Sequence, residues 1–139
     1  MCQDCLTLVR HDLETLALLS PAAASQKPPL DASDRKCTLL FYMACIYLRA
    51  LAHQRGKAIE RHADARTWLN TEPDLVAIAR PYRMLEERSR DARYDGRRFS
   101  QPELQGMHRW FCAIRDHLVP LLKATGLAIV PVVEPLPYL

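Results

Sequence analysis

Glycine is scarce in this chain of 139 residues, which has four glycines and no cluster of them. A loop that cradles phosphate groups with backbone amides needs several closely spaced glycines, so the sequence excludes that kind of nucleotide site. Long apolar runs are also missing, because the longest, residues 38–48, is too short to span a bilayer. The start of the chain has no apolar segment typical of a signal peptide. We therefore expect a cytoplasmic protein that does not enter a membrane.

Charge of one sign is not in large excess either. Nineteen basic and sixteen acidic residues give a net charge of +3, so composition alone does not indicate nucleic-acid binding. The five cysteines are odd in number, and Cys2 and Cys5 form a lone C-x-x-C. No second pair follows at the spacing of a zinc ribbon, so we expect reduced thiols, no metal and no cofactor.

Helical periodicity is the main feature that the sequence does have. Apolar residues recur at spacings of three and four in four segments, and no convincing strand pattern or internal repeat is present. The segments are residues 6–16, 33–55, 71–95 and 100–126, with a brief helical piece at 61–68. The sequence predicts an all-α fold, a four-helix, up-and-down antiparallel bundle with a possible fifth short helix. We expect one domain over residues 1–126.

Capping residues mark where these helices begin and end. Ser33 and Thr71 are predicted N-caps, and Ser100 with Glu103 has the form of a capping box. Gly56 is predicted to cap the end of the second helix, and Asp95-Gly96 and Gly126 are expected to end the later two. The last segment, residues 127–139, is apolar and carries three prolines, so it is predicted to be an extended tail rather than a helix or central strand.

The second helix is apolar on nearly every side between Leu39 and Leu51. A helix with this pattern is either central in its own domain or partly covered by another subunit. Together with the apolar tail, this pattern predicts a homodimer.

Arginines concentrate at one point of the chain, where residues 88–100 read RSRDARYDGRRFS. One interpretation is a solvated helix end in which carboxylates pair with guanidinium groups, such as Glu87 with Arg83 and Arg90. The other is an anion-binding corner, because arginine forms strong forked hydrogen bonds to phosphate. The candidate residues for nucleic-acid or anion binding are Arg83, Arg88, Arg90, Arg93, Tyr94 and Arg97, with His62 and Arg66 on the short helix.

The same residues carry a resemblance to a known family. An apolar helix reading FYMACIYLRAL at residues 41–51 leads to a turn with Arg61-His62, and a later helix ends in YRMLEERSRDARY at residues 82–94. Phe99-Ser100 and a final amphipathic helix follow. Over residues 35–123 the chain resembles the HEPN (higher eukaryotes and prokaryotes nucleotide-binding) domain family.

The resemblance implies a helical bundle that is commonly dimeric, and a toxin–antitoxin or defence context. Many members are metal-independent ribonucleases, others bind RNA or nucleotides, and several pair with a nucleotidyltransferase partner protein. Catalytic members carry Arg-x(4–6)-His near this corner, whereas here Arg88 is followed at that spacing by Arg93. Arginine is a poor general base, so efficient cleavage is not expected.

Three functions remain open at this point. The first is a HEPN-like module that binds RNA or nucleotide through the arginine-rich corner. The second is a dimeric protein-interaction module paired with a nucleotidyltransferase-type partner. The third is a metal-independent ribonuclease toxin that uses a different histidine.

Overall fold

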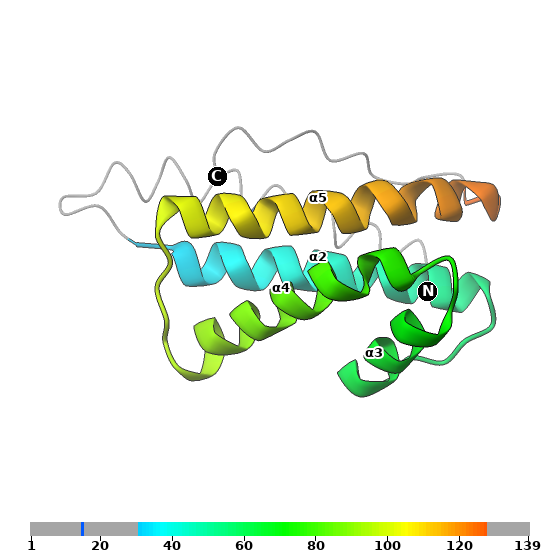
Figure 1. The fold of residues 1–139 in the computed structure, drawn as a ribbon, viewed down its shortest axis with the longest axis horizontal. Helices are drawn as coiled ribbons and strands as arrows, with labels where there is room; N and C mark the ends of the chain where they lie inside the picture. The colour runs from blue at the N-terminus through cyan, green and yellow to red at the C-terminus, as the bar shows by residue number, and fades with distance from the viewer. Residues whose placement is uncertain (1–14, 16–30, 128–139) are drawn as a thin grey trace.

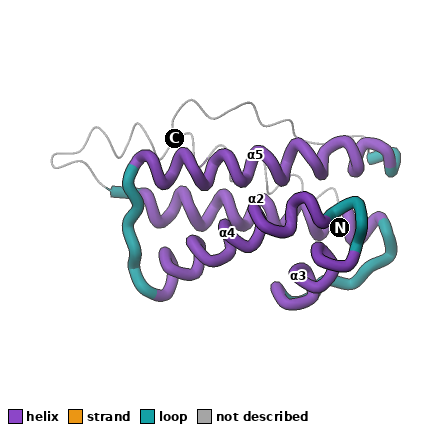
Figure 2. Tube along the Cα trace, viewed as in Figure 1, coloured by secondary structure: helices purple, strands orange, loops and turns teal. Residues whose placement is uncertain are grey.

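The computed structural model describes Thr15 and residues 31–127, and this part of the chain contains four α-helices and no strand (Figures 1 and 2). The helices are α2 (Ser33–Gln54), α3 (His62–Thr71), α4 (Val76–Tyr94) and α5 (Gln101–Ala124). The predicted all-α bundle is thereby confirmed, including a short additional helix, α3.

The three long helices form the body of the bundle. Helices α2, α4 and α5 each contact the other two, and α3 packs against α4. Figure 1 shows that α2 and α5 run in the same direction and that α4 runs in the opposite direction, with α2 drawn between α5 and α4, so the long helices follow an up–down–up order along the chain. None of the helices in the described part of the chain is both long and apolar enough to cross a membrane.

Helix α2 is the centre of the core. Residues on nearly all sides of it are buried, including Phe41, Met43, Tyr47 and Leu51, which have no exposed surface. The predicted homodimer rested on this apolar circumference, which is already buried within a single chain, and on the apolar tail, most of which lies outside the described residues. A central position in the domain explains the pattern, and the homodimer stays a prediction that sedimentation can test.

The start of α2 differs from the prediction. Ser33 is the first helical residue and Ala32 occupies the N-cap position, without a side-chain cap. The Oγ atom of Ser33 instead accepts a hydrogen bond from the backbone amide of Phe99 at 2.9 Å, while Asp31 accepts one from the Ser33 amide. The prediction of Ser33 as N-cap was wrong because its hydroxyl is engaged by the distant loop between α4 and α5.

The predicted start of the third long helix was also wrong. Thr71 is the last residue of α3, and its hydroxyl donates to the carbonyl of Thr67 inside that helix. Helix α4 begins at Val76, after a turn that contains Pro73. Threonine suits both a helix start and a last turn in which its hydroxyl bonds back to a carbonyl, so the local sequence did not separate the two.

The later boundaries agree with the sequence. Ser100 and Glu103 form the predicted capping box at the start of α5. Helix α4 ends at Tyr94, directly before Asp95-Gly96, and Gly96 has a φ of 63°, a conformation in which glycine is strongly favoured. The first predicted helix, apart from the helical Thr15, lies outside the described residues. The pair Cys2 and Cys5 and the tail beyond residue 127 lie outside them as well.

Candidate nucleic-acid interface

The loop between α4 and α5 is fixed to the start of α2. The guanidinium of Arg98 donates to the carboxylate of Asp34 and to the backbone carbonyl of Asp31, each at 2.7 Å. The side chain of Phe99 is buried, and its amide is held by Ser33. Arg98 therefore supports the loop and is not available as an open cation.

Two further arginines of the corner belong to one ion-pair network. Asp91 accepts from Arg88 at 3.5 Å and from Arg97 at 3.3 Å, and Arg97 also donates to Glu103 at 2.8 Å. Glu103 in turn completes the capping box of α5, and the hydrogen bond from the Ser100 amide is the main reason that its pKa is lowered. This part of the corner matches the interpretation of paired charges.

Arg93 is held in a different way, by aromatic rings and neutral oxygens. Its guanidinium carbon lies 5.5 Å from the ring centre of Tyr42 and 5.3 Å from that of Tyr94. Its Nη1 donates to the Tyr42 hydroxyl at 3.1 Å, and its Nε donates to the carbonyl of Ser89 at 3.2 Å. Within the described residues no carboxylate pairs with Arg93, so its positive charge is oriented but not neutralised. We call Tyr42, Arg93 and Tyr94 the tyrosine–arginine stack.

The surroundings of this stack are open to solvent. Tyr94 is 75% exposed and Tyr42 39% exposed, and they are two of the three large exposed apolar side chains of the described chain. Arg90, one turn before Tyr94 on α4, is exposed and has no ion-pair or hydrogen-bond partner among the described residues. The predicted pairing of Arg90 with Glu87 is absent there, whereas Glu87 does lie 3.8 Å from Arg83.

A buried pair of polar groups between α2 and α4 stays protonated at neutral pH. Cys45 and Tyr82 hydrogen-bond to each other at 3.3 Å in the core. Burial raises the pKa of Cys45 to about 11 and raises the pKa of Tyr82 further above its usual range. The described residues contain no cluster of three or more potential metal ligands. The exposed part of the corner thus presents guanidinium and aromatic groups.

The two candidate residues on α3 are used mainly for packing. The Nη1 atom of Arg66 donates to Glu86 at 2.5 Å, and the Glu86 side chain is 7% exposed while that of Arg66 is 44% exposed. This pair compensates a buried carboxylate and fixes α3 on α4. The ring of His62 packs on Phe41, with ring centres 5.3 Å apart.

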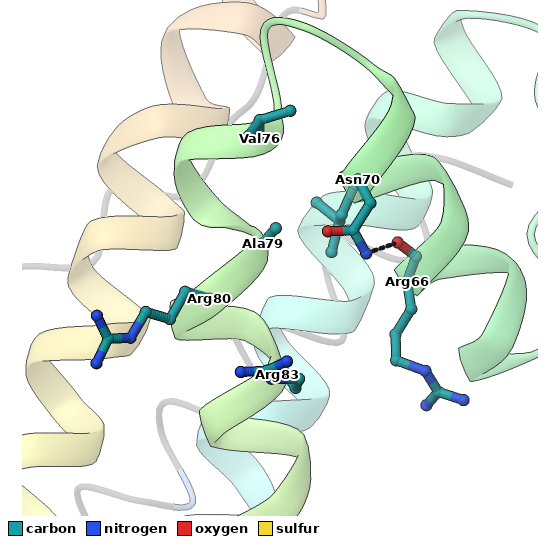
Figure 3. A pocket seen from close by; sticks show the side chains of 7 residues that line it. Arg66, Asn70, Val76, Ala79, Arg80 and Arg83 are labelled. Carbon is teal, nitrogen blue, oxygen red and sulfur yellow. Dashed lines mark hydrogen bonds between the residues drawn. The ribbon is translucent and has the colours of Figure 1, made fainter.

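A hollow of about 250 Å³ lies between α3 and α4. Leu69, Val76 and Ala79 form its apolar part. Its polar lining consists of Arg66, Asn70, Arg80 and Arg83, and Figure 3 shows that the guanidinium groups of Arg66 and Arg80 point in different directions. We call this hollow the α3–α4 groove. Of the predicted site residues, it brings together Arg66 and Arg83.

Tyr42 is the functional candidate that the sequence did not reveal. It lies on α2, 51 residues before Arg93, within a helix that is apolar nearly all round. One signal was present, because Arg35, Tyr42 and Arg49 recur at intervals of seven residues and are all exposed. A seven-residue interval is close to two helical turns, so these residues mark the exposed edge of α2.

Comparisons of the chain with protein-family models, with curated proteins and with solved structures give no match. The resemblance to HEPN proteins therefore stays a prediction that rests on the residues quoted for it.

Proposed function

We propose that this protein binds single-stranded RNA or nucleotides at the tyrosine–arginine stack, with Arg90 contacting phosphate. The observation that carries the proposal is the guanidinium of Arg93 fixed between two exposed tyrosine rings and unmatched by a carboxylate in the described chain. The HEPN resemblance supports the same function, and we propose the toxin–antitoxin or defence context of that family.

Stacking supplies the first part of the binding energy in this proposal. An exposed aromatic ring accepts any base on its face, and each base–aromatic contact contributes about 1–3 kcal/mol. Tyr94 presents such a ring at the end of α4, with the guanidinium of Arg93 5.3 Å from the ring centre. Because every base has a flat face, we expect weak sequence preference.

Charge supplies the second part. Arg90 and Arg93 have no carboxylate partner among the described residues, whereas Arg88, Arg97 and Arg98 do. A guanidinium without a carboxylate partner keeps its full positive charge for phosphate, and Arg90 can form forked hydrogen bonds to phosphate oxygens, whereas Arg93 also holds the Ser89 carbonyl and the Tyr42 hydroxyl. The expected phosphate contacts therefore involve Arg90 and Arg93 rather than the whole arginine-rich corner.

The ion pairs favour a second candidate function, a protein-interaction module in which the corner is structural. Arg97 and Arg98 fix the α4–α5 loop through Glu103 and Asp34, as a corner without a ligand would require. Binding measurements on Tyr94 variants separate the two candidates, because only the first needs the exposed ring.

The test is fluorescence anisotropy with a labelled single-stranded RNA and with a labelled nucleotide, at low salt. Tyr94→Ala should weaken binding about tenfold, in line with the loss of one stacked base, and Tyr94→Phe should bind like the original protein. Arg93→Lys keeps the charge but loses the planar group, and it should also weaken binding. Equal affinity for Tyr94→Ala and Tyr94→Phe, or no binding at all, would favour the interaction module.

A further inference from the structure

We propose that a bound single strand continues from the tyrosine–arginine stack along the exposed edge of α4 and ends at the α3–α4 groove, where Arg80 and Arg83 contact its phosphates. The inference rests on the proposed function and extends it to a second contact region, so it predicts how affinity depends on the length of the RNA.

The exposed residues of α4 form one continuous edge. Arg80, Arg83, Glu87, Arg90 and Tyr94 are all exposed, and they recur at spacings of three and four residues. Such spacing places side chains on one face of a helix. From residue 80 to residue 94 the edge is about 21 Å long, since a helix rises about 1.5 Å per residue. A stacked strand at about 3.4 Å per nucleotide needs about six nucleotides to cover this length.

Two of the three arginines in the groove have charge available for phosphate. Arg80 has no partner among the described residues, and Arg83 reaches Glu87 only at 3.8 Å, with both side chains more than half exposed. An exposed pair of this kind is weak. Arg66 is instead committed to the buried Glu86 at 2.5 Å. The groove therefore presents two cations at the end of the edge opposite Tyr94.

The orientation of these groups favours an extended polyanion over a small anion. Arg66 and Arg80 point in different directions around the groove (Figure 3), so one phosphate or carboxylate does not meet all of its arginines. Successive phosphates of one strand fit such spread charges. The apolar surface of Val76, which is 51% exposed, adjoins Asn70 and offers a place for a base at the end of the strand.

Glu87 is the one acidic residue of this edge, and its charge opposes phosphate binding. Glu87 lies between Arg83 and Arg90, and its carboxylate repels phosphate while it partly neutralises Arg83. A strand that follows the edge must pass this carboxylate. Replacing Glu87 with glutamine should therefore strengthen binding of long strands, an effect that damage to the fold would not produce.

The experiment compares oligouridylates of two, four, six and eight nucleotides with a mononucleotide, by anisotropy across a salt series on the full chain. Affinity should rise with length and level off at about six nucleotides, the length that covers the edge. The double variant Arg80→Ala with Arg83→Ala should weaken the eight-nucleotide strand several-fold and flatten its log–log salt dependence by about 1.4, since each contact on a single strand contributes about 0.7. Binding of the mononucleotide should not change.

Glu87→Gln should raise the affinity for the eight-nucleotide strand by about two- to fivefold, the range for one exposed charge interaction. The matched control is Arg109→Ala with Lys123→Ala, which removes two positive charges from α5 and should leave the length dependence intact. Circular dichroism checks the helix content of each variant.

The outcomes separate this inference from the function it extends. If short and long strands bind equally, or the groove variants leave long strands unaffected while Tyr94→Ala weakens all of them, the extended track is wrong and the stack remains. If neither RNA nor the mononucleotide binds, or a polyglutamate peptide of equal charge binds as well as RNA, both proposals are wrong.

Discussion

The two halves of the arginine-rich corner differ in what holds their guanidinium groups. Arg88, Arg97 and Arg98 pair with carboxylates, and we call them the structural half. Arg90 and Arg93, which we call the binding half, have no carboxylate partner in the described chain, and Arg93 is held by tyrosines. The arginines of this cluster thus do not form one functional unit. The structural half stabilises the loop between α4 and α5, and the binding half has positive charge available for a ligand.

The largest expected effect is on the free energy of unfolding, and it tests the loop that the structural half stabilises. Phe99→Ala should lower the free energy of unfolding by about 3 kcal/mol, the cost of removing a buried phenyl ring, because this ring is only 6% exposed. Tyr94→Ala, at the exposed end of α4, should change it by less than about 0.5 kcal/mol. Urea unfolding of both variants measures the difference, and similar losses in the two would remove the distinction between the halves.

The next effect tests the binding half. Changing Arg90 and Arg93 together to alanine should flatten the log–log salt dependence of RNA binding by about 1.4, or twice the contribution of one phosphate contact on a single strand. Helix content should stay the same, because Arg90 is exposed and Arg93 is only half-buried. Anisotropy across a salt series gives the slope. An unchanged slope would mean that these arginines belong with the structural half after all.

A smaller effect concerns pH. Hydrogen bonds from Ser33 lower the pKa of Asp31, and those from Ser100 lower the pKa of Glu103. A carboxyl group with a lower pKa in the folded chain stabilises the fold above its unfolded pKa of about 4, and this stabilisation is lost as pH falls through the folded value. Stability should therefore fall as pH drops below about 5, where these carboxyl groups begin to bind protons in the unfolded chain. Urea midpoints across this range measure the decline, which should be shallower for Asp31→Asn with Glu103→Gln.

The last prediction expects no effect at all, because the protein should not cleave RNA. The resemblance to HEPN proteins aligns Arg93 with the position of their catalytic histidine, and Arg93 here contacts the rings of Tyr42 and Tyr94. Arginine is a poor general base, so efficient cleavage is not expected. Structured and unstructured RNA should remain intact after incubation with the purified protein, as gel electrophoresis would show. Rapid cleavage that Arg88→Ala abolishes would contradict this and assign catalysis to the structural half.

Much of the fold could be predicted because its signals are local. The capping box of Ser100 and Glu103 and the turn at Gly96 each depend on a few neighbouring residues, and both are present. The error at Thr71 was also local, because threonine suits both ends of a helix, whereas the error at Ser33 arose from a distant contact. Serine is a residue type that favours the N-cap position, but the hydroxyl of Ser33 accepts a hydrogen bond from the amide of Phe99, 66 residues away.

The candidate site was predictable only in part for the same reason. Arg93 and Tyr94 stood out because they lie in one arginine-rich stretch. Whether an arginine of that stretch pairs with a carboxylate or with a tyrosine depends on residues of other helices, namely Tyr42, Asp34 and Glu103. Which arginine meets which partner is set by tertiary packing, and no spacing within residues 83–98 encodes it.

The contacts that define the corner also join distant parts of the chain. The hydrogen-bonded pairs are separated by 51 residues of sequence for Arg93 and Tyr42, 64 for Arg98 and Asp34, and 66 for Phe99 and Ser33. Contacts with such long sequence separation form only after a large loop has closed, so they come late relative to turns within single helices. A truncated chain that contains α4 without α2 carries the arginine charge without the ring of Tyr42. The complete stack therefore exists only once α2 and α4 have docked, which makes it a marker of the fully folded protein.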